Sequence, residues 1–189
     1  MNIKYVAIKK KFGVIFNINF IKTNIIMNSE IIFNADLDST SIYVMKVFPA
    51  NVTTVWDYFT KSELIDKWWG PKPWNCETIR MEFRENGIWH YAMVGPNGQK
   101  AFCVVKYGEI NEHRSFDQES KFSDEKGIVE PDMPETKWLF GFTGVEEGTK
   151  LTVNLKISTK EKMQQQLEMG FEGGFKMGLN QLEDLLAEK

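Results

Sequence analysis

The sequence predicts an α+β fold in which a curved antiparallel sheet of about six to seven strands packs on one long C-terminal helix. Between residues 76 and 157, apolar and polar side chains alternate in segments joined by short turns, and consecutive strands of this kind pair as an antiparallel meander. From residue 158 onward the apolar side chains recur at helical spacing. Such a helix has one apolar face, which it must bury against the sheet.

The first predicted strand covers residues 41–48, which are rich in β-branched and aromatic side chains. It ends at Pro49, which cannot donate a hydrogen bond to a ladder. We expect residues 30–36 to pair with it through a turn at Asp38-Ser39.

Two short helices follow the first strand. Asn51 is expected to cap the first helix, whose buried face is Val52, Val55, Trp56 and Phe59. Ser62 is expected to cap the second helix, and Gly70-Pro71 ends it.

Six further strands are predicted from alternation with period two. In the first of them, Ile79, Met81 and Phe83 form the buried side. The Asn86-Gly87 pair and residues 95–98 mark tight turns. The other strands are predicted at residues 88–94, 101–110, 115–122, 138–142 and 151–157, with an acidic loop at 123–135.

The C-terminal helix begins at a capping box, in which Ser158 and Glu161 satisfy free backbone N–H groups. Its apolar stripe is Met163, Leu167, Phe171, Phe175, Leu179, Leu182 and Leu186. Gly170, Gly174 and Gly178 lie four residues apart, on one flank. Three glycines there indicate close approach to something bulky, either the sheet or a ligand, and tight packing on the sheet is the simpler interpretation.

Composition excludes several classes of function. The net charge of −3 argues against a general nucleic-acid binder. Cys76 and Cys103 lack Cys-x-x-Cys spacing and are expected to be buried free thiols, and two histidines cannot supply a His-rich metal site. No apolar run is long enough to span a membrane. We therefore expect a cytoplasmic protein with no metal and no cofactor.

Residues 1–26 differ from the rest of the chain. Nineteen of them are Ile, Lys, Asn or Phe, and none is acidic. All four residue types have codons made of A and T alone, as in translated AT-rich DNA upstream of a start codon. We expect residues 1–26 to be a non-native or disordered extension and residues 27–189 to form the domain. A signal peptide is the alternative, although no Ala-x-Ala cleavage pattern follows.

Three local signatures resemble one known family. They are Val47-Phe48-Pro49-Ala50 leading into Val55-Trp56, then Leu64 through Trp68-Trp69-Gly70-Pro71, then Phe83-x-x-x-Gly87-x-Trp89 followed by the hairpin at 93–98. Across residues 41–187 the chain resembles the family related to the activator of the heat shock protein 90 ATPase, within the START-like (helix-grip, SRPBCC) superfamily. Many relatives have paired glycines where this chain has Asn86-Gly87, which alters one turn.

The resemblance implies a cavity between the sheet and the C-terminal helix that holds a small apolar or amphipathic molecule, such as a lipid. A dry cavity of about 300 Å³ would cost roughly 7 kcal/mol, so we expect a small pocket or one closed by Phe and Met side chains. Candidate lining residues are those that share the buried face of a predicted strand or helix. For each of them, simple packing in the core is the alternative to contact with a ligand. The candidates are Trp89, Tyr91, Met93, Trp138, Phe140, Phe142, Phe171 and Phe175. Trp68 and Trp69 either gate the entrance or anchor the second helix.

Two other functions stay open. Some relatives act as aromatase/cyclases or dehydratases, and lyase or hydrolase activity would use the same cavity, with His90 and Tyr91 as the first polar groups to test. No Gly-x-Ser-x-Gly or dinucleotide-binding pattern supports catalysis. The family also suggests a co-chaperone role through protein interaction. The sequence does not decide between a monomer and a homodimer.

Overall fold

The computed structural model describes residues 30–130 and 133–188, so the predicted extension at residues 1–26 lies outside the described residues. Eight strands and four helices follow one another in the order β1, β2, α1, α2, β3 to β8, α3, α4. Their bounds are β1 Ile32–Asp36, β2 Ser41–Phe48, α1 Val52–Thr60, α2 Ser62–Ile65, β3 Asn75–Met81, β4 Ile88–Val94, β5 Lys100–Asn111, β6 Ser115–Ser123, β7 Glu135–Val145, β8 Gly148–Ile157, α3 Lys160–Glu168 and α4 Phe171–Ala187.

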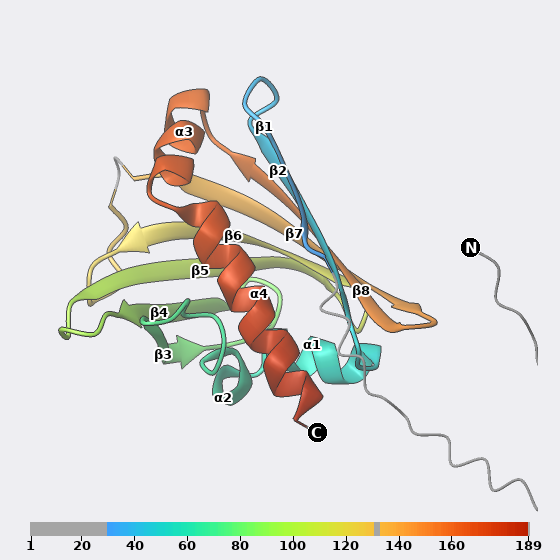
Figure 1. The fold of residues 1–189 in the computed structure, drawn as a ribbon. Helices are drawn as coiled ribbons and strands as arrows, with labels where there is room; N and C mark the ends of the chain where they lie inside the picture. The colour runs from blue at the N-terminus through green and yellow to red at the C-terminus, as the bar shows by residue number, and fades with distance from the viewer. Residues whose placement is uncertain (1–29, 131–132, 189) are drawn as a thin grey trace, which may run out of the picture.

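All eight strands form one antiparallel sheet in the order β1-β2-β8-β7-β6-β5-β4-β3. The sheet curves behind α4, which runs diagonally across its concave face, with α1 and α2 below (Figure 1). This is the predicted fold, with one strand more than the six to seven expected. The eighth strand is the edge strand β1, which pairs antiparallel with β2 as expected for residues 30–36, although its mostly exposed side chains give little alternation.

Two predicted helix starts are corrected by one residue. Asn51 caps α1 as predicted, because its side-chain oxygen accepts a hydrogen bond from the Thr54 N–H at 2.9 Å. The residue before α2 is Lys61, so Ser62 is the first helical residue and not the cap. Helix α3 is capped by Thr159, which accepts from the Lys162 N–H at 3.2 Å, and not by Ser158.

The predicted position of Ile79 is wrong. A bulge lies between Thr78 and Arg80 in the pairing of β3 with β4, and Ile79 is 53% exposed. A bulge inserts one unpaired residue and shifts which side chains face the core. Alternation in the sequence therefore placed Ile79 on the wrong side.

The predicted single C-terminal helix is two helices. Helix α3 ends at Glu168, and α4 begins after Gly170, whose φ of 88° lies in the left-handed region. Glycine takes this conformation without steric cost, so it permits a sharp break within a continuous apolar stripe. The break turns α3 away from the axis of α4, as Figure 1 shows.

The C-terminal half of α4 is fixed to the sheet by apolar packing and by one buried ion pair. Leu179, Leu182 and Leu186 are buried in the core. The Lys46 ammonium on β2 lies 2.9 Å from the Glu183 carboxylate on α4, and both side chains are almost wholly buried. Lys46 also donates to the Asn180 side chain at 3.2 Å. Removing one partner of such a pair leaves a buried charge, which costs about 3–5 kcal/mol.

Among the described residues, no helix combines the length and the apolar character that a membrane span requires.

Gly170→Ala should lower the free energy of unfolding by about 1 kcal/mol, because alanine is strained at positive φ although space for its methyl group is free. Gly173→Ala is the matched control, three residues further on in α4, where φ is helical and space is also free. It should raise stability by about 0.5 kcal/mol. Urea unfolding of both variants measures this difference, and equal effects of the two would contradict the assigned break.

Candidate functional site

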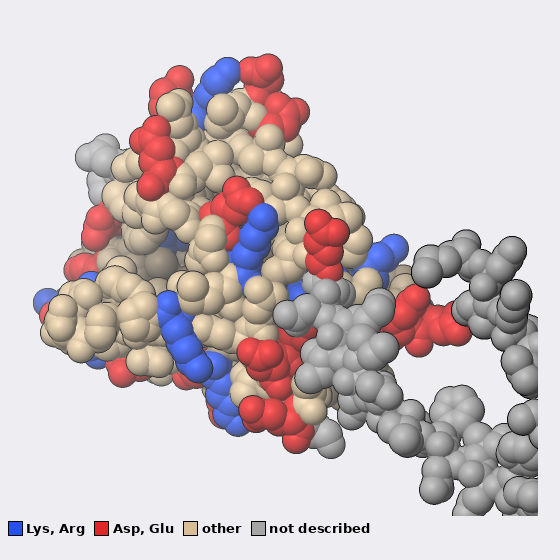
Figure 2. All heavy atoms as spheres, in the orientation of Figure 1, with Lys and Arg blue, Asp and Glu red and all other residues tan. Residues whose placement is uncertain are grey.

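A cavity of about 280 Å³ lies between the concave face of the sheet and the start of α4. Its walls come from residues 68–71 after α2, from β4 to β7, and from the junction of α3 with α4. Figure 2 shows a hollow left of centre, on the side where the α3–α4 junction faces the ends of β5 and β6, and uncharged side chains surround most of it. The cavity is at the small end of the range for ligand pockets.

Aromatic rings form much of the wall. Trp138 on β7 is the centre of this group, with ring centroids 5.8 Å from Phe171, 5.7 Å from Phe175 and 6.0 Å from Trp69. The interplanar angles of these pairs lie between 52° and 68°, which is typical of edge-to-face contacts. The rings hold one another in place and present apolar surface to the cavity.

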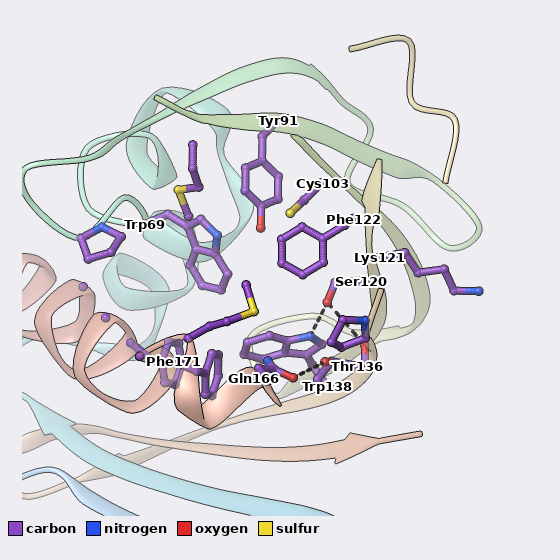
Figure 3. A pocket seen from close by; sticks show the side chains of 18 of the residues that line it. Trp69, Tyr91, Cys103, Ser120, Lys121, Phe122, Thr136, Trp138, Gln166 and Phe171 are labelled. Carbon is purple, nitrogen blue, oxygen red and sulfur yellow. Dashed lines mark hydrogen bonds between the residues drawn. The ribbon is translucent and has the colours of Figure 1, made fainter. Parts of the chain in front are cut away.

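Tyr91 and Cys103, which lie opposite each other on β4 and β5, form the inner polar part of the cavity. The Tyr91 hydroxyl points into the cavity (Figure 3). Burial raises the pKa of Tyr91 well above its ordinary value, with a smaller effect from Cys103. Burial also raises the pKa of the Cys103 thiol to about 11. Both groups are therefore neutral at physiological pH.

A second set of polar side chains lines the part of the cavity wall formed by β6, β7 and α3. The Trp138 indole N–H donates to the Ser120 hydroxyl at 2.8 Å, and the Thr136 hydroxyl donates to the Gln166 side chain at 3.2 Å. The second bond joins β7 to α3, and both are drawn in Figure 3. These bonds fix the Trp138 ring and connect α3 to the sheet beside the cavity.

Gln181 on α4 holds the segment of residues 68–72, which forms one wall. Its side-chain amide donates to the Trp68 and Gly70 carbonyls, each at 2.9 Å, and its oxygen accepts from the Lys72 N–H at 2.9 Å. Trp68 is anchored further by its indole N–H, which donates to the Tyr58 carbonyl at 2.9 Å. Both tryptophans line the cavity, but Trp68 is buried and acts as an anchor, whereas Trp69 is partly exposed.

The glycine flank of α4 faces the 68–72 segment and not the sheet. A methyl group on Gly178 would lie 3.3 Å from the Trp68 carbonyl oxygen, and one on Gly174 would lie 3.5 Å from the Pro71 ring. Gly170, Gly174 and Gly178 all line the cavity. The glycines allow close packing on residues 68–72 and also leave volume that side chains would otherwise fill.

Five of the eight predicted lining residues lie together around the cavity: Tyr91, Met93, Trp138, Phe171 and Phe175. The other three, Trp89, Phe140 and Phe142, share the same face of the sheet but lie in the core outside the lining. Phe140 and Phe142 lie 5.7 and 5.3 Å from Phe59 of α1. That these residues contact a ligand stays a prediction.

The sequence reasoning missed several lining residues, among them Cys103, Ser120, Phe122, Thr136 and Gln166. Ser120, Phe122 and Thr136 alternate with exposed or paired residues on β6 and β7, so their strand period was a usable signal. Gln166 carried no signal, because it lies off the apolar stripe of the helix.

His90, which was considered as a polar group of the cavity, is not part of its lining. It alternates with Tyr91 along β4 and so points to the opposite face of the sheet, where its ring lies beside Gly127. Both cysteines are free thiols as predicted, but only Cys76 is buried and Cys103 is partly buried, because it faces the cavity. Among the residues that the structure describes, no three His, Cys, Asp or Glu side chains are grouped to hold a metal ion.

An antiparallel sheet that grips a C-terminal helix around an apolar cavity defines a helix-grip domain of the START-like (SRPBCC) superfamily. A sequence profile of the family described as "Activator of Hsp90 ATPase homolog 1-like protein" matches residues 49–187. The chain belongs to this family.

Solved structures of bacterial proteins have the same fold. A Mycobacterium smegmatis protein is 28% identical, with a TM-score of 0.77, and the alignment covers 83% of this chain and 97% of that one. An Arthrobacter aurescens protein is 26% identical, with a TM-score of 0.79 and coverage of 84% and 92%. An AHSA1 protein from Silicibacter pomeroyi, 16% identical over 78% of this chain and 97% of that one, supports the fold alone, with a TM-score of 0.63. No curated protein matches the chain.

Gln181→Ala should lower the free energy of unfolding by about 2 kcal/mol, because three backbone groups of the 68–72 segment lose their partner. Asp184→Ala, at an exposed position nearly one turn further along α4, should change it by less than about 0.5 kcal/mol. Urea denaturation of both variants checks this, and equal stability of the two would show that Gln181 does not hold the segment.

Stability should fall at alkaline pH partly because of Cys103. The folded state keeps the thiol proton until its pKa of about 11, whereas the unfolded thiol releases it near its ordinary value of 9.0. Above about pH 9 the unfolded state thus binds fewer protons, and the unfolding free energy decreases by at most about 1.4 kcal/mol per pH unit.

Cys103→Ala removes this contribution, so its unfolding free energy should decrease less steeply between about pH 9 and pH 11 than that of the unmodified chain. Denaturant titrations at several pH values give both slopes. Parallel slopes would contradict the raised pKa of the Cys103 thiol.

Proposed function

We propose that this protein binds a small apolar molecule in the cavity between the sheet and α4. The cavity carries the proposal: it is bounded by aromatic rings, contains a few neutral polar groups (Figure 3) and opens at the surface as a hollow (Figure 2). Ligand pockets usually combine a mainly apolar lining with a small number of polar groups that fix orientation. Membership in the family agrees with this function.

The expected affinity is moderate. A two-ring molecule and the walls around it would together remove about 400 Å² of apolar surface from water, which is about 10 kcal/mol at 25 cal/mol/Å². Association costs at least about 4 kcal/mol. The remaining 6 kcal/mol or so corresponds to a dissociation constant of some tens of micromolar.

The polar groups of the cavity suit binding better than bond-making. Cys103 would need to be a thiolate to act as a nucleophile, but its pKa is raised to about 11. The hydroxyls of Ser120 and Thr136 are engaged with Trp138 and Gln166. A hydroxyl nucleophile requires an adjacent base, and no histidine is among the described residues that line the cavity.

2-Acetylnaphthalene, at about ten times its dissociation constant, should raise the thermal midpoint by about 3–6 °C. Mass action at this ratio gives about 1.4 kcal/mol, and each kcal/mol corresponds to about 2–4 °C for a domain of this size. Cys103→Phe, which places a ring in the cavity, should abolish this shift.

Lys106→Phe is the matched control, because it puts the same ring on the same strand at an exposed position outside the cavity lining. This variant should keep the shift. The proposal fails if 2-acetylnaphthalene and other ring compounds of similar size do not stabilise the unmodified chain, or if Cys103→Phe responds as Lys106→Phe does.

A further inference from the structure

Among the described residues, the cavity wall offers no free counter-charge to an ionised ligand. Lys121 is the one charged residue among the described residues that line it. The Lys121 ammonium lies 2.8 Å from the Glu119 carboxylate and 2.9 Å from the Glu135 carboxylate, and its side chain points away from the other lining residues in Figure 3. A carboxylate ligand would therefore enter an apolar site without a cation to pair with, which is costly.

The inner end of the cavity presents a hydrogen-bond donor. The Tyr91 hydroxyl points into the cavity (Figure 3), and Cys103 lies opposite Tyr91 in the pairing of β4 with β5. Burial keeps the Tyr91 pKa high, so the hydroxyl can donate its proton. The sulfur of Cys103 is a weak acceptor. A ligand oxygen is a stronger acceptor and would be the preferred partner of the Tyr91 hydroxyl.

Aromatic rings form the cavity walls near the Tyr91 hydroxyl. Trp69 and Trp138 lie 6.0 Å apart, and Trp69 lies 6.1 Å from Phe175. Aromatic side chains gain from offset or edge-to-face contact with another ring, beyond the area that is buried. The lining therefore favours a ring over a flexible acyl chain, which also loses more conformational entropy on binding.

We propose that the cavity selects an uncharged ring compound that carries a hydrogen-bond acceptor, such as a ketone oxygen, and that the Tyr91 hydroxyl donates to that oxygen. This inference rests on the proposed function and narrows it. It makes fatty-acid anions poor ligands, because their charged group would be unpaired.

Three naphthalene derivatives of nearly equal size test the inference: 2-acetylnaphthalene, 2-ethylnaphthalene and 2-naphthoate. They share the ring and differ in their substituent, which is a neutral acceptor, an alkyl group or a charged carboxylate. Dissociation constants at pH 7.5 are measured by calorimetry or by competition. We expect 2-naphthoate to bind at least about 100-fold more weakly than 2-acetylnaphthalene, because its carboxylate is buried without a partner.

Tyr91→Phe isolates the hydrogen bond. The variant should bind 2-acetylnaphthalene about fivefold more weakly, which is the usual contribution of one neutral hydrogen bond. Its affinity for 2-ethylnaphthalene should change by less than about twofold. Retained binding of 2-ethylnaphthalene shows that the variant is folded with its cavity intact. Tyr107→Phe is the matched control, because the Tyr107 hydroxyl is buried outside the cavity lining and has no hydrogen-bond partner among the described residues. It should leave all three affinities unchanged.

The outcomes separate the two proposals. If none of the three compounds binds the unmodified chain, the proposed function fails and this inference fails with it. If 2-naphthoate binds as tightly as 2-acetylnaphthalene, the selection of neutral ligands is wrong while the binding function stands. If Tyr91→Phe weakens 2-acetylnaphthalene and 2-ethylnaphthalene equally, Tyr91 is not the donor.

Discussion

Helix α4 has to pack on two different surfaces at once, and the rest of the structure follows from this constraint. Its C-terminal half is fixed to β2 by buried leucines and by the Lys46–Glu183 ion pair. Its glycine flank approaches the 68–72 segment, to which Gln181 binds with three hydrogen bonds. The same glycines line the cavity, and because they have no side chains they leave part of its volume between α4, the 68–72 segment and strands β4 to β7.

The same arrangement sets the chemistry of the cavity. Burial keeps Tyr91 and Cys103 protonated, and the charge of Lys121 is paired with Glu119 and Glu135. Binding of a neutral molecule that fills such a cavity is favourable. Binding of a charged molecule is unfavourable, because burying an unpaired ion in apolar surroundings costs free energy. The proposed selectivity for neutral ligands rests on these neutral and paired groups.

From the sequence, the face of the sheet on which a side chain lies could be predicted. Whether that side chain lines the cavity or packs in the core could not. Alternation identified the concave face of β4 and β7, but Trp89, Phe140 and Phe142 lie in the core of that face and Tyr91 and Trp138 lie at the cavity. Phe140 and Phe142 are covered by α1, where Phe59 contacts both rings, and Trp89 packs against Trp69. Tertiary contacts of this kind leave no period in the sequence. The bulge at Ile79 and the break at Gly170 could not be predicted for a similar reason. Each is a local change in backbone conformation that does not interrupt the apolar pattern of the sequence.

NMR of the chain labelled with ¹³C at its methionine methyl groups tests most directly whether the cavity is the binding site. Met93 on β4 and Met169 at the junction of α3 with α4 line the cavity, whereas Met177 on α4 lies outside its lining. With 2-acetylnaphthalene bound, the account predicts nuclear Overhauser effects from the naphthyl protons to the methyl groups of Met93 and Met169, and none to Met177. Effects at Met177 without any at Met93 and Met169 would place the ligand on the outer surface and contradict the account.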